Sequence, residues 1–139
     1  MPMVHRVRVN ILAKDVATSV HFYERIFGMM EVESHDWIKI LALPGDRQFE
    51  LGLIDEVSQY VPRAARGIAE GAYLTLVVDD VVAIADAAFA EGVEIVDPPR
   101  GEGRLMRTLI RDPNGVVIDV VTPEVSHYLE RELPADLTL

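Results

Sequence analysis

The chain has 139 residues, 50% hydrophobic and 26% charged, which excludes a disordered chain and fits one compact domain. The lack of cysteine excludes disulfides, thiolate metal sites and a cysteine nucleophile. The formal net charge of −10 disfavours nucleic acid as a partner, and it either attracts cationic small molecules or serves solubility alone.

Membrane and export signals are not expected. No apolar run reaches the ~18 residues that a membrane-spanning helix needs, so no membrane partner is predicted. The N-terminal sequence MPMVHRVRVN lacks the apolar stretch of a signal peptide, and a cytoplasmic location is the expectation.

The first elements form a strand, a helix and three strands. Residues 4–12 alternate between apolar and polar side chains, which predicts a half-buried strand with Arg8 on its polar face. Apolar residues at helical spacing predict a helix that is capped by Asp15 or Thr18 and ends at Gly28. Short apolar runs predict the strands that follow, at residues 29–34, 37–43 and 48–54.

The same order of elements then returns. Residues 55–72 lose the alternation and are interpreted as a connector with a helical turn. A strand at 72–78 and a helix, capped by Asp79 or Asp80 and closed by Gly92, come next. Three further strands are predicted at residues 93–99, 105–111 and 116–122.

The pattern predicts an α+β protein in which βαβββ occurs twice. We expect a single domain over residues 1–139, whose mixed sheets curl their helix-free faces into a cleft. Its parts are a first module (4–55), a connector (56–71), a second module (72–123) and a C-terminal tail (124–139) that contains the short helical sequence SHYLEREL.

Strand alternation places four polar side chains toward this cleft. Arg8 and Glu50 come from the first module, and Tyr73 and Asp119 come from the second. Asp119 stands alone in an aliphatic strand, where a buried, unpaired carboxylate would cost several kcal/mol or stay protonated. We therefore expect its charge to meet water or a ligand.

Two sequence segments resemble the vicinal oxygen chelate superfamily, which includes glyoxalase I, bleomycin-resistance proteins and extradiol dioxygenases. DVATSVHFYERIFGM is similar to the family segment D-x-x-x-S-x-x-FY-x-x-x-x-G, and RDPNGVVIDVV is similar to DP-[DN]-G-x-x-[IV]-E. The resemblance covers about residues 4–123. Both segments build turns and packing, so they indicate the fold rather than an activity.

The resemblance also implies where metal-using relatives hold their ion. The four ligand positions fall on Arg8, Glu50, Tyr73 and Asp119, where such relatives mostly have His, Glu or Gln. Arg8 only donates hydrogen bonds, and Tyr73 is a poor ligand near neutral pH. The expectation is that no metal is bound and that Arg8 neutralises Glu50 or Asp119. A divalent ion held by Glu50 and Asp119 is the alternative.

Two other residues are candidates for ligand binding. Trp37 either lines the cavity and stacks on a flat ligand or packs in the core. Arg107 could bind an anion, although its face is ambiguous because Leu105 and Met106 are both apolar. The four histidines show no pair with metal-ligand spacing.

Three functions are compatible with these residues. The first is a metal-free protein that binds a small, planar or cationic molecule. The second is a lyase, isomerase or dioxygenase in which Glu50 or Asp119 is a general base, while Tyr73 and Arg8 stabilise an enolate-like oxygen. The third is an interaction module whose cleft is filled by the connector. Relatives often pair two chains, so a homodimer is expected.

Overall fold

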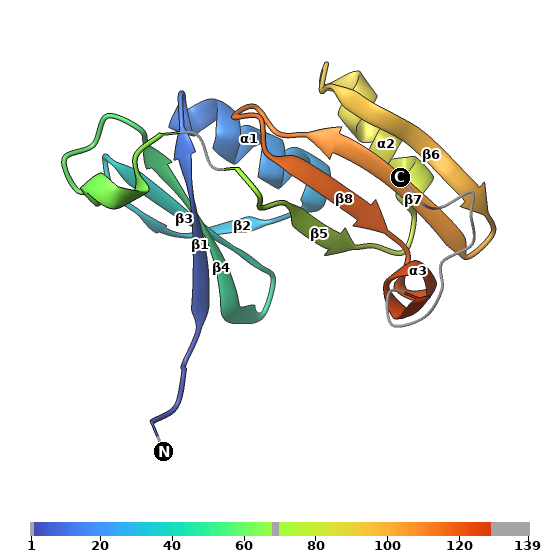
Figure 1. The fold of residues 1–139 in the computed structure, drawn as a ribbon, viewed down its shortest axis with the longest axis horizontal. Coiled ribbons are helices and arrows are strands. Elements are labelled where there is room, and N and C mark those ends of the chain that lie inside the picture. The colour runs from blue at the N-terminus through green and yellow to red at the C-terminus, as the bar shows by residue number, and fades with distance from the viewer. Residues whose placement is uncertain (1, 68–69, 129–139) are drawn as a thin grey trace. The chain divides into compact units, whose positions relative to one another are not determined.

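The computed structural model describes residues 2–67 and 70–128, and the chain divides into two compact units, residues 1–68 and 69–139 (Figure 1). Each unit has a four-stranded sheet that contains parallel and antiparallel pairs. The order of elements confirms the α+β class and the two βαβββ modules. Within the described residues, no helix is both long enough and apolar enough to cross a membrane.

The first unit contains one helix, α1, and the strand order β1-β4-β3-β2. Its elements are β1 (Val7–Ala13), α1 (Val16–Phe27), β2 (Met30–Ser34), β3 (Ile38–Leu43) and β4 (Asp46–Asp55). Strand β1 runs parallel to β4, whereas β3 runs antiparallel to both β4 and β2. Helix α1 packs against β3 and β4, and it buries Phe22, Tyr23 and Ile26.

The segment DVATSVHFYERIFGM, which resembles a segment of the superfamily, determines where α1 begins and ends. Asp15 is the N-cap, because its carboxylate accepts a hydrogen bond from the Thr18 backbone N–H at 3.1 Å. Ser19 is buried and donates its hydroxyl to the Asp15 carbonyl. Gly28 ends the helix with a left-handed φ of 68°. This segment therefore has a structural role.

The second unit repeats this arrangement with the strand order β5-β8-β7-β6. Its elements are β5 (Leu74–Val77), α2 (Val81–Ala90), β6 (Ile95–Glu102), β7 (Leu105–Arg111), β8 (Val117–Val121) and α3 (Pro123–Tyr128). Strand β5 runs parallel to β8, and α2 packs against β6 and β7. Asp80, rather than Asp79, caps α2 by accepting the Ala83 N–H at 2.9 Å.

The second family-like segment makes the turn into β8. The Asp112 carboxylate accepts the backbone N–H groups of Asn114 and Val116, both at 2.8 Å. Gly115 has a φ of 90°, which side chains other than glycine rarely adopt. The turn thus sets the start of β8, the strand that carries Asp119.

The structure differs from the predicted elements at β6. The predicted strand ends at Pro99, whereas β6 continues to Glu102 and pairs with β7 up to Leu105. The pairing register shifts between Asp97 and Arg100, so the two prolines lie at an irregularity of an edge strand, where missing N–H donors are tolerated.

The connector and the tail contain short helical pieces. The predicted helical turn of the connector is a 3₁₀ helix, η1 (Arg63–Ala65). Helix α3 begins at Pro123, before the predicted sequence SHYLEREL, and packs on β7 and β8. Val125 meets Val121 and Leu105 there. Residues 129–133 of the predicted piece lie outside the described part of the chain.

Candidate functional site

The parallel pairing of β1 with β4 brings two arginines to a glutamate. Arg8 lies opposite Glu50 in the register, and Arg6 immediately precedes β1. Arg8 donates from Nε and Nη2 to Oε1 of Glu50 at 3.4 and 3.3 Å. Nη1 of Arg6 donates to Oε2 at 3.5 Å. The expected ion pair between Arg8 and Glu50 is confirmed.

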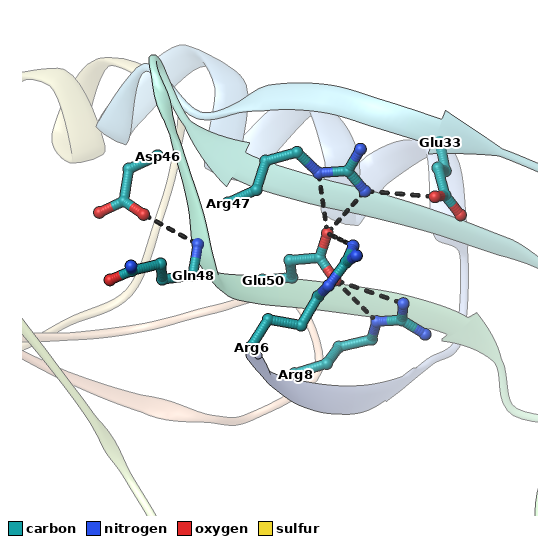
Figure 2. Close-up of polar contacts among 7 residues, drawn as sticks. All are labelled: Arg6, Arg8, Glu33, Asp46, Arg47, Gln48 and Glu50. Atoms are coloured by element: carbon teal, nitrogen blue, oxygen red, sulfur yellow. Dashed lines mark hydrogen bonds and ion pairs between the residues drawn. The ribbon is translucent and has the colours of Figure 1, made fainter. Parts of the chain in front are cut away.

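A third arginine completes the environment of Glu50. Arg47, also on β4, donates from Nε and Nη2 to Oε2 of Glu50 at 3.0 and 2.7 Å. Its Nη2 also donates to Glu33 at 3.2 Å. Figure 2 shows the three guanidinium groups converging on one carboxylate, whose side chain is inaccessible to solvent. We call Arg6, Arg8, Arg47, Glu33 and Glu50 the arginine cluster.

The arginine cluster keeps Glu50 ionised. Its hydrogen bonds with Arg47 are the main reason that the pKa of Glu50 is lowered, and those with Arg8 act in the same direction. Burial opposes this effect but does not outweigh it. The same contacts with Glu50 raise the pKa of Arg47 above its ordinary value. Both shifts favour the charged forms of Glu50 and Arg47 at neutral pH.

Asp119 has a corresponding arrangement in the second unit. Nε of Arg107 donates to Oδ1 of Asp119 at 2.6 Å, and the Thr75 hydroxyl donates to Oδ2 at 3.2 Å. The side chain of Asp119 is 1% exposed and that of Arg107 is 13% exposed. The expectation that the charge of Asp119 meets water is wrong, because the side chain is buried and an arginine and a hydroxyl compensate its charge. The expected contact of Asp119 with a ligand stays a prediction.

Among the described residues, neither aromatic candidate forms a hydrogen bond with the buried carboxylate of its own unit. Tyr73 precedes β5 and is 62% exposed. Trp37 is partly buried, and its ring centroid lies 4.7 Å from that of Tyr60 and 6.4 Å from that of His35. It also packs against an apolar cluster that includes Ile38. Trp37 therefore contributes to the core while its other side meets two exposed aromatic residues.

The sheet face that bears Glu50 has an apolar half as well. Ile40 lies opposite Gly52 and Ile38 opposite Ile54, so their side chains share this face with Glu50. Val61 of the connector is buried against them. The connector thus covers the apolar half, and the arginine cluster forms the polar half.

The predicted site residues form two separate pairs. Arg8 contacts Glu50 in the first unit, and Arg107 contacts Asp119 in the second. The convergence of Arg8, Glu50, Tyr73 and Asp119 on one cleft stays a prediction. Sequence reasoning missed Arg47 because the predicted strand begins only at residue 48, whereas β4 already begins at Asp46.

The side chains at the four positions predicted to correspond to the metal ligands of relatives do not suit a metal ion. Arg8 is a cation and offers only donors. Both oxygens of Glu50 accept hydrogen bonds from arginines, and both oxygens of Asp119 accept hydrogen bonds from Arg107 and Thr75. In the described ranges, no three His, Cys, Asp or Glu side chains are grouped so that they could hold a metal. A divalent ion would have to displace these arginines.

Several solved structures are similar to this chain, and the names of these proteins describe different roles. An integron cassette protein from the mobile metagenome of V. cholerae is 23% identical, with a TM-score of 0.67, and the match covers 88% of this chain and 98% of that one. An antibiotic-binding protein from a Streptomyces species is 24% identical, with a TM-score of 0.64 and the same coverage. A lactoylglutathione lyase from Agrobacterium tumefaciens is 18% identical, with a TM-score of 0.62, and the match covers 90% and 98%.

These matches define the class as the glyoxalase-like fold of paired βαβββ modules. The family model described as Glyoxalase/Bleomycin resistance protein/Dioxygenase superfamily matches residues 5–120, and the chain belongs to this family. None of the curated proteins compared with the chain matches it.

Proposed function

We propose that this chain is a small-molecule-binding protein that works without a metal ion at the positions of Arg8, Glu50, Tyr73 and Asp119. One observation carries the proposal: both carboxylates at these positions are buried in ion pairs with arginines. A similar fold occurs in a Streptomyces protein whose name describes antibiotic binding, which is compatible with sequestration as the activity.

The enzymatic alternative has less support from the same geometry. A general base works best when its pKa lies near the operating pH, whereas arginines lower the pKa of Glu50. Asp119 is buried beneath Arg107 and Thr75. A lyase, isomerase or dioxygenase that used either acid as a base would first have to break these contacts.

One observation favours the interaction module. Val61 of the connector covers the apolar half of the Glu50 face, which is the kind of filling expected of a cleft that no longer binds a ligand. The polar half is not filled in this way, because the three arginines there are between 36% and 49% exposed. We therefore place small-molecule binding first and protein interaction second.

The test combines metal analysis with a ligand screen. Protein purified without chelators should contain substoichiometric zinc, nickel, iron and manganese by mass spectrometry. In a thermal-shift screen with a chelator present, at least one small molecule should raise the unfolding temperature, because a ligand at about 100 times its Kd adds about 2.7 kcal/mol of stability. Stoichiometric metal would refute the proposal, and a screen without any hit would favour the interaction module.

We also propose a homodimer. Strand β1 is an edge strand of its sheet, and three apolar side chains at or before its start are exposed: Met3, Val4 and Val7. Exposed apolar residues at a strand edge are typical of contact surfaces. Sedimentation equilibrium should give twice the 15.5 kDa mass of the chain at micromolar concentration, whereas a single-chain mass throughout would contradict the homodimer.

A further inference from the structure

The arginine cluster has more positive than negative charge. Its three guanidinium groups face two carboxylates, so its formal charge is +3 − 2 = +1, on a chain whose net charge is −10. Ligand recognition depends on the local field of a site rather than on the total charge. The cationic ligand expected from the total charge is therefore the wrong match for this part of the protein.

The guanidinium groups also keep donors available. Arg6 uses only Nη1 in its contact with Glu50, and Nη1 of both Arg8 and Arg47 donates to none of the described residues. The side chains of Arg6, Arg8 and Arg47 are 49%, 36% and 43% exposed, whereas Glu50 is inaccessible. The acid thus lies beneath a layer of arginines that solvent reaches (Figure 2).

The backbone beneath the cluster is adapted to these side chains. Gly52 lies opposite Asn10 in the register, two residues after Glu50. A Cβ at Gly52 would lie 2.2 Å from Oδ1 of Asn10 and 3.2 Å from Cδ of Arg8. The glycine therefore leaves the space in which the Arg8 side chain lies along the sheet toward Glu50.

We infer that Arg6, Arg8 and Arg47 bind an oxyanion, the carboxylate or phosphate group of the small molecule. This inference rests on the proposed function and names the chemical class of the ligand. The planar guanidinium group of arginine matches the geometry of carboxylate and phosphate groups, and it can donate two parallel hydrogen bonds to one such group. Glu50 holds the guanidinium groups together from below and acts as an internal counter-ion that the ligand does not need to displace.

The inference predicts opposite effects of two substitutions. Arg6→Gln removes an exposed donor whose one contact with Glu50 is long, so phosphate binding should weaken by about fivefold with little change of the fold. Glu50→Gln removes the internal counter-ion, so phosphate should bind several-fold more tightly. If the arginines served only to pair Glu50, neither substitution would change phosphate binding in this way.

The experiment uses the full chain with inorganic phosphate and succinate as probes and tetramethylammonium as the cationic comparison. Binding is followed by NMR shifts of the arginine Nε–H groups and by calorimetry, at low and at physiological ionic strength. The control is Arg104→Gln, which makes the same change of charge in the second unit, at a side chain 88% exposed. Phosphate and succinate should bind the wild type and Arg104→Gln equally and more weakly at higher salt.

Two results would overturn the inference: neither anion shifts the arginine signals, or Arg6→Gln binds both anions as well as Arg104→Gln does. The ligand screen separates this failure from failure of the proposed function. If a neutral or cationic compound stabilises the metal-free protein while the anions do not bind, only the oxyanion inference is lost. Stoichiometric metal would remove the proposed function itself. If Glu50→Gln does not fold, the comparison of anion binding by Arg6→Gln and Arg104→Gln still decides whether the arginine cluster binds oxyanions.

Discussion

Both buried carboxylates of the described sheets are compensated by arginines on neighbouring strands. Glu50 meets arginines of β1 and of its own strand, and Asp119 meets Arg107 of β7. Burying an ion costs several kcal/mol, and this cost is offset only where partners satisfy its lone pairs. The two sites differ in exposure, because solvent reaches the arginines over Glu50 but hardly reaches Arg107.

The lowered pKa of Glu50 predicts how stability depends on pH. Because the pKa is lower in the folded state, the contribution of Glu50 is complete above the unfolded value of about 4.3 and is lost as the pH falls through the folded pKa. At pH 7, Glu50→Gln should have a smaller free energy of unfolding than the wild type. The difference should shrink below about pH 4. Urea unfolding at a series of pH values measures it.

Glu33→Gln is the control for this series, since Glu33 is 43% exposed and contacts Arg47 alone. The free energy of unfolding of Glu33→Gln should differ from that of the wild type by less than about 1 kcal/mol at every pH. A difference between the wild type and Glu50→Gln that grows as the pH falls would contradict the lowered pKa.

Removing Arg107, the ion-pair partner of Asp119, should lower the free energy of unfolding more than Glu33→Gln does. Arg107→Met would leave the buried Asp119 carboxylate with the Thr75 hydroxyl as its hydrogen-bond partner among the described residues, and this should cost about 3–5 kcal/mol of unfolding free energy. The double variant Arg107→Met/Asp119→Leu should recover most of the loss, because no unpaired charge remains. Chemical denaturation measures both.

The matched control is Arg100→Met, which breaks the exposed ion pair between Arg100 and Asp97 within β6. Its cost should be about 0–1 kcal/mol. Equal losses in Arg100→Met and Arg107→Met, or no recovery in the double variant, would show that the charge of Asp119 does not depend on Arg107.

The residue-scale contacts were predictable where strand alternation was regular. Alternation in residues 4–12 put Arg8 on the polar face, and its pair with Glu50 follows from the parallel register. Arg8 was offered as a possible partner of Asp119, whereas Arg107 was not, because it follows two apolar residues and its face was ambiguous in the sequence. Arg47 carried no periodic signal, since it lies just before the predicted strand at residues 48–54, although β4 includes it.

At the scale of elements, helix boundaries followed from capping chemistry. The sequence offered two candidates for each cap, and the structure selects Asp15 and Asp80. Asp15→Ala and Asp80→Ala should each cost about 1 kcal/mol, because each leaves a backbone N–H of the first helical turn without its acceptor. Thermal unfolding should show a loss of roughly 3–5 °C for each.

The rejected candidates supply the controls. Thr18→Ala and Asp79→Ala each remove another polar side chain near the start of a helix. Neither removes a side-chain capping hydrogen bond that the structure shows. Their unfolding temperatures should lie within about 1 °C of the wild type. If Thr18→Ala cost as much as Asp15→Ala, the cap of α1 would be misassigned.

Strand lengths were predicted less well than helix ends. Two consecutive prolines usually end a strand, and this rule placed the end of β6 at Pro99. The strand continues because it has only one neighbour, β7, and its register shifts around the prolines. Whether a strand lies at an edge is a property of the sheet, and periodicity within one segment carries no information about it.

At the scale of the whole molecule, the repeated βαβββ order predicted two four-stranded sheets, each with a helix between the first two of its strands in the chain, and this prediction is confirmed. Alternation assigns each side chain to a face of its own sheet, but it does not specify how two sheets pack against each other. The cleft shared by Arg8, Glu50, Tyr73 and Asp119 therefore stays a prediction, while the ion pairs within each unit follow from local register.

These local pairs lead to a prediction for the intact protein. Dialysis against a chelator should leave its unfolding temperature unchanged, because arginines occupy the carboxylates where relatives would place ligands for an ion. Added zinc or nickel should not raise the unfolding temperature either, since a metal that binds the folded state would stabilise it by mass action. Differential scanning calorimetry before dialysis, after dialysis and after addition of metal measures this. A fall of several degrees that zinc or nickel restores would show that the folded protein holds an ion despite its arginines.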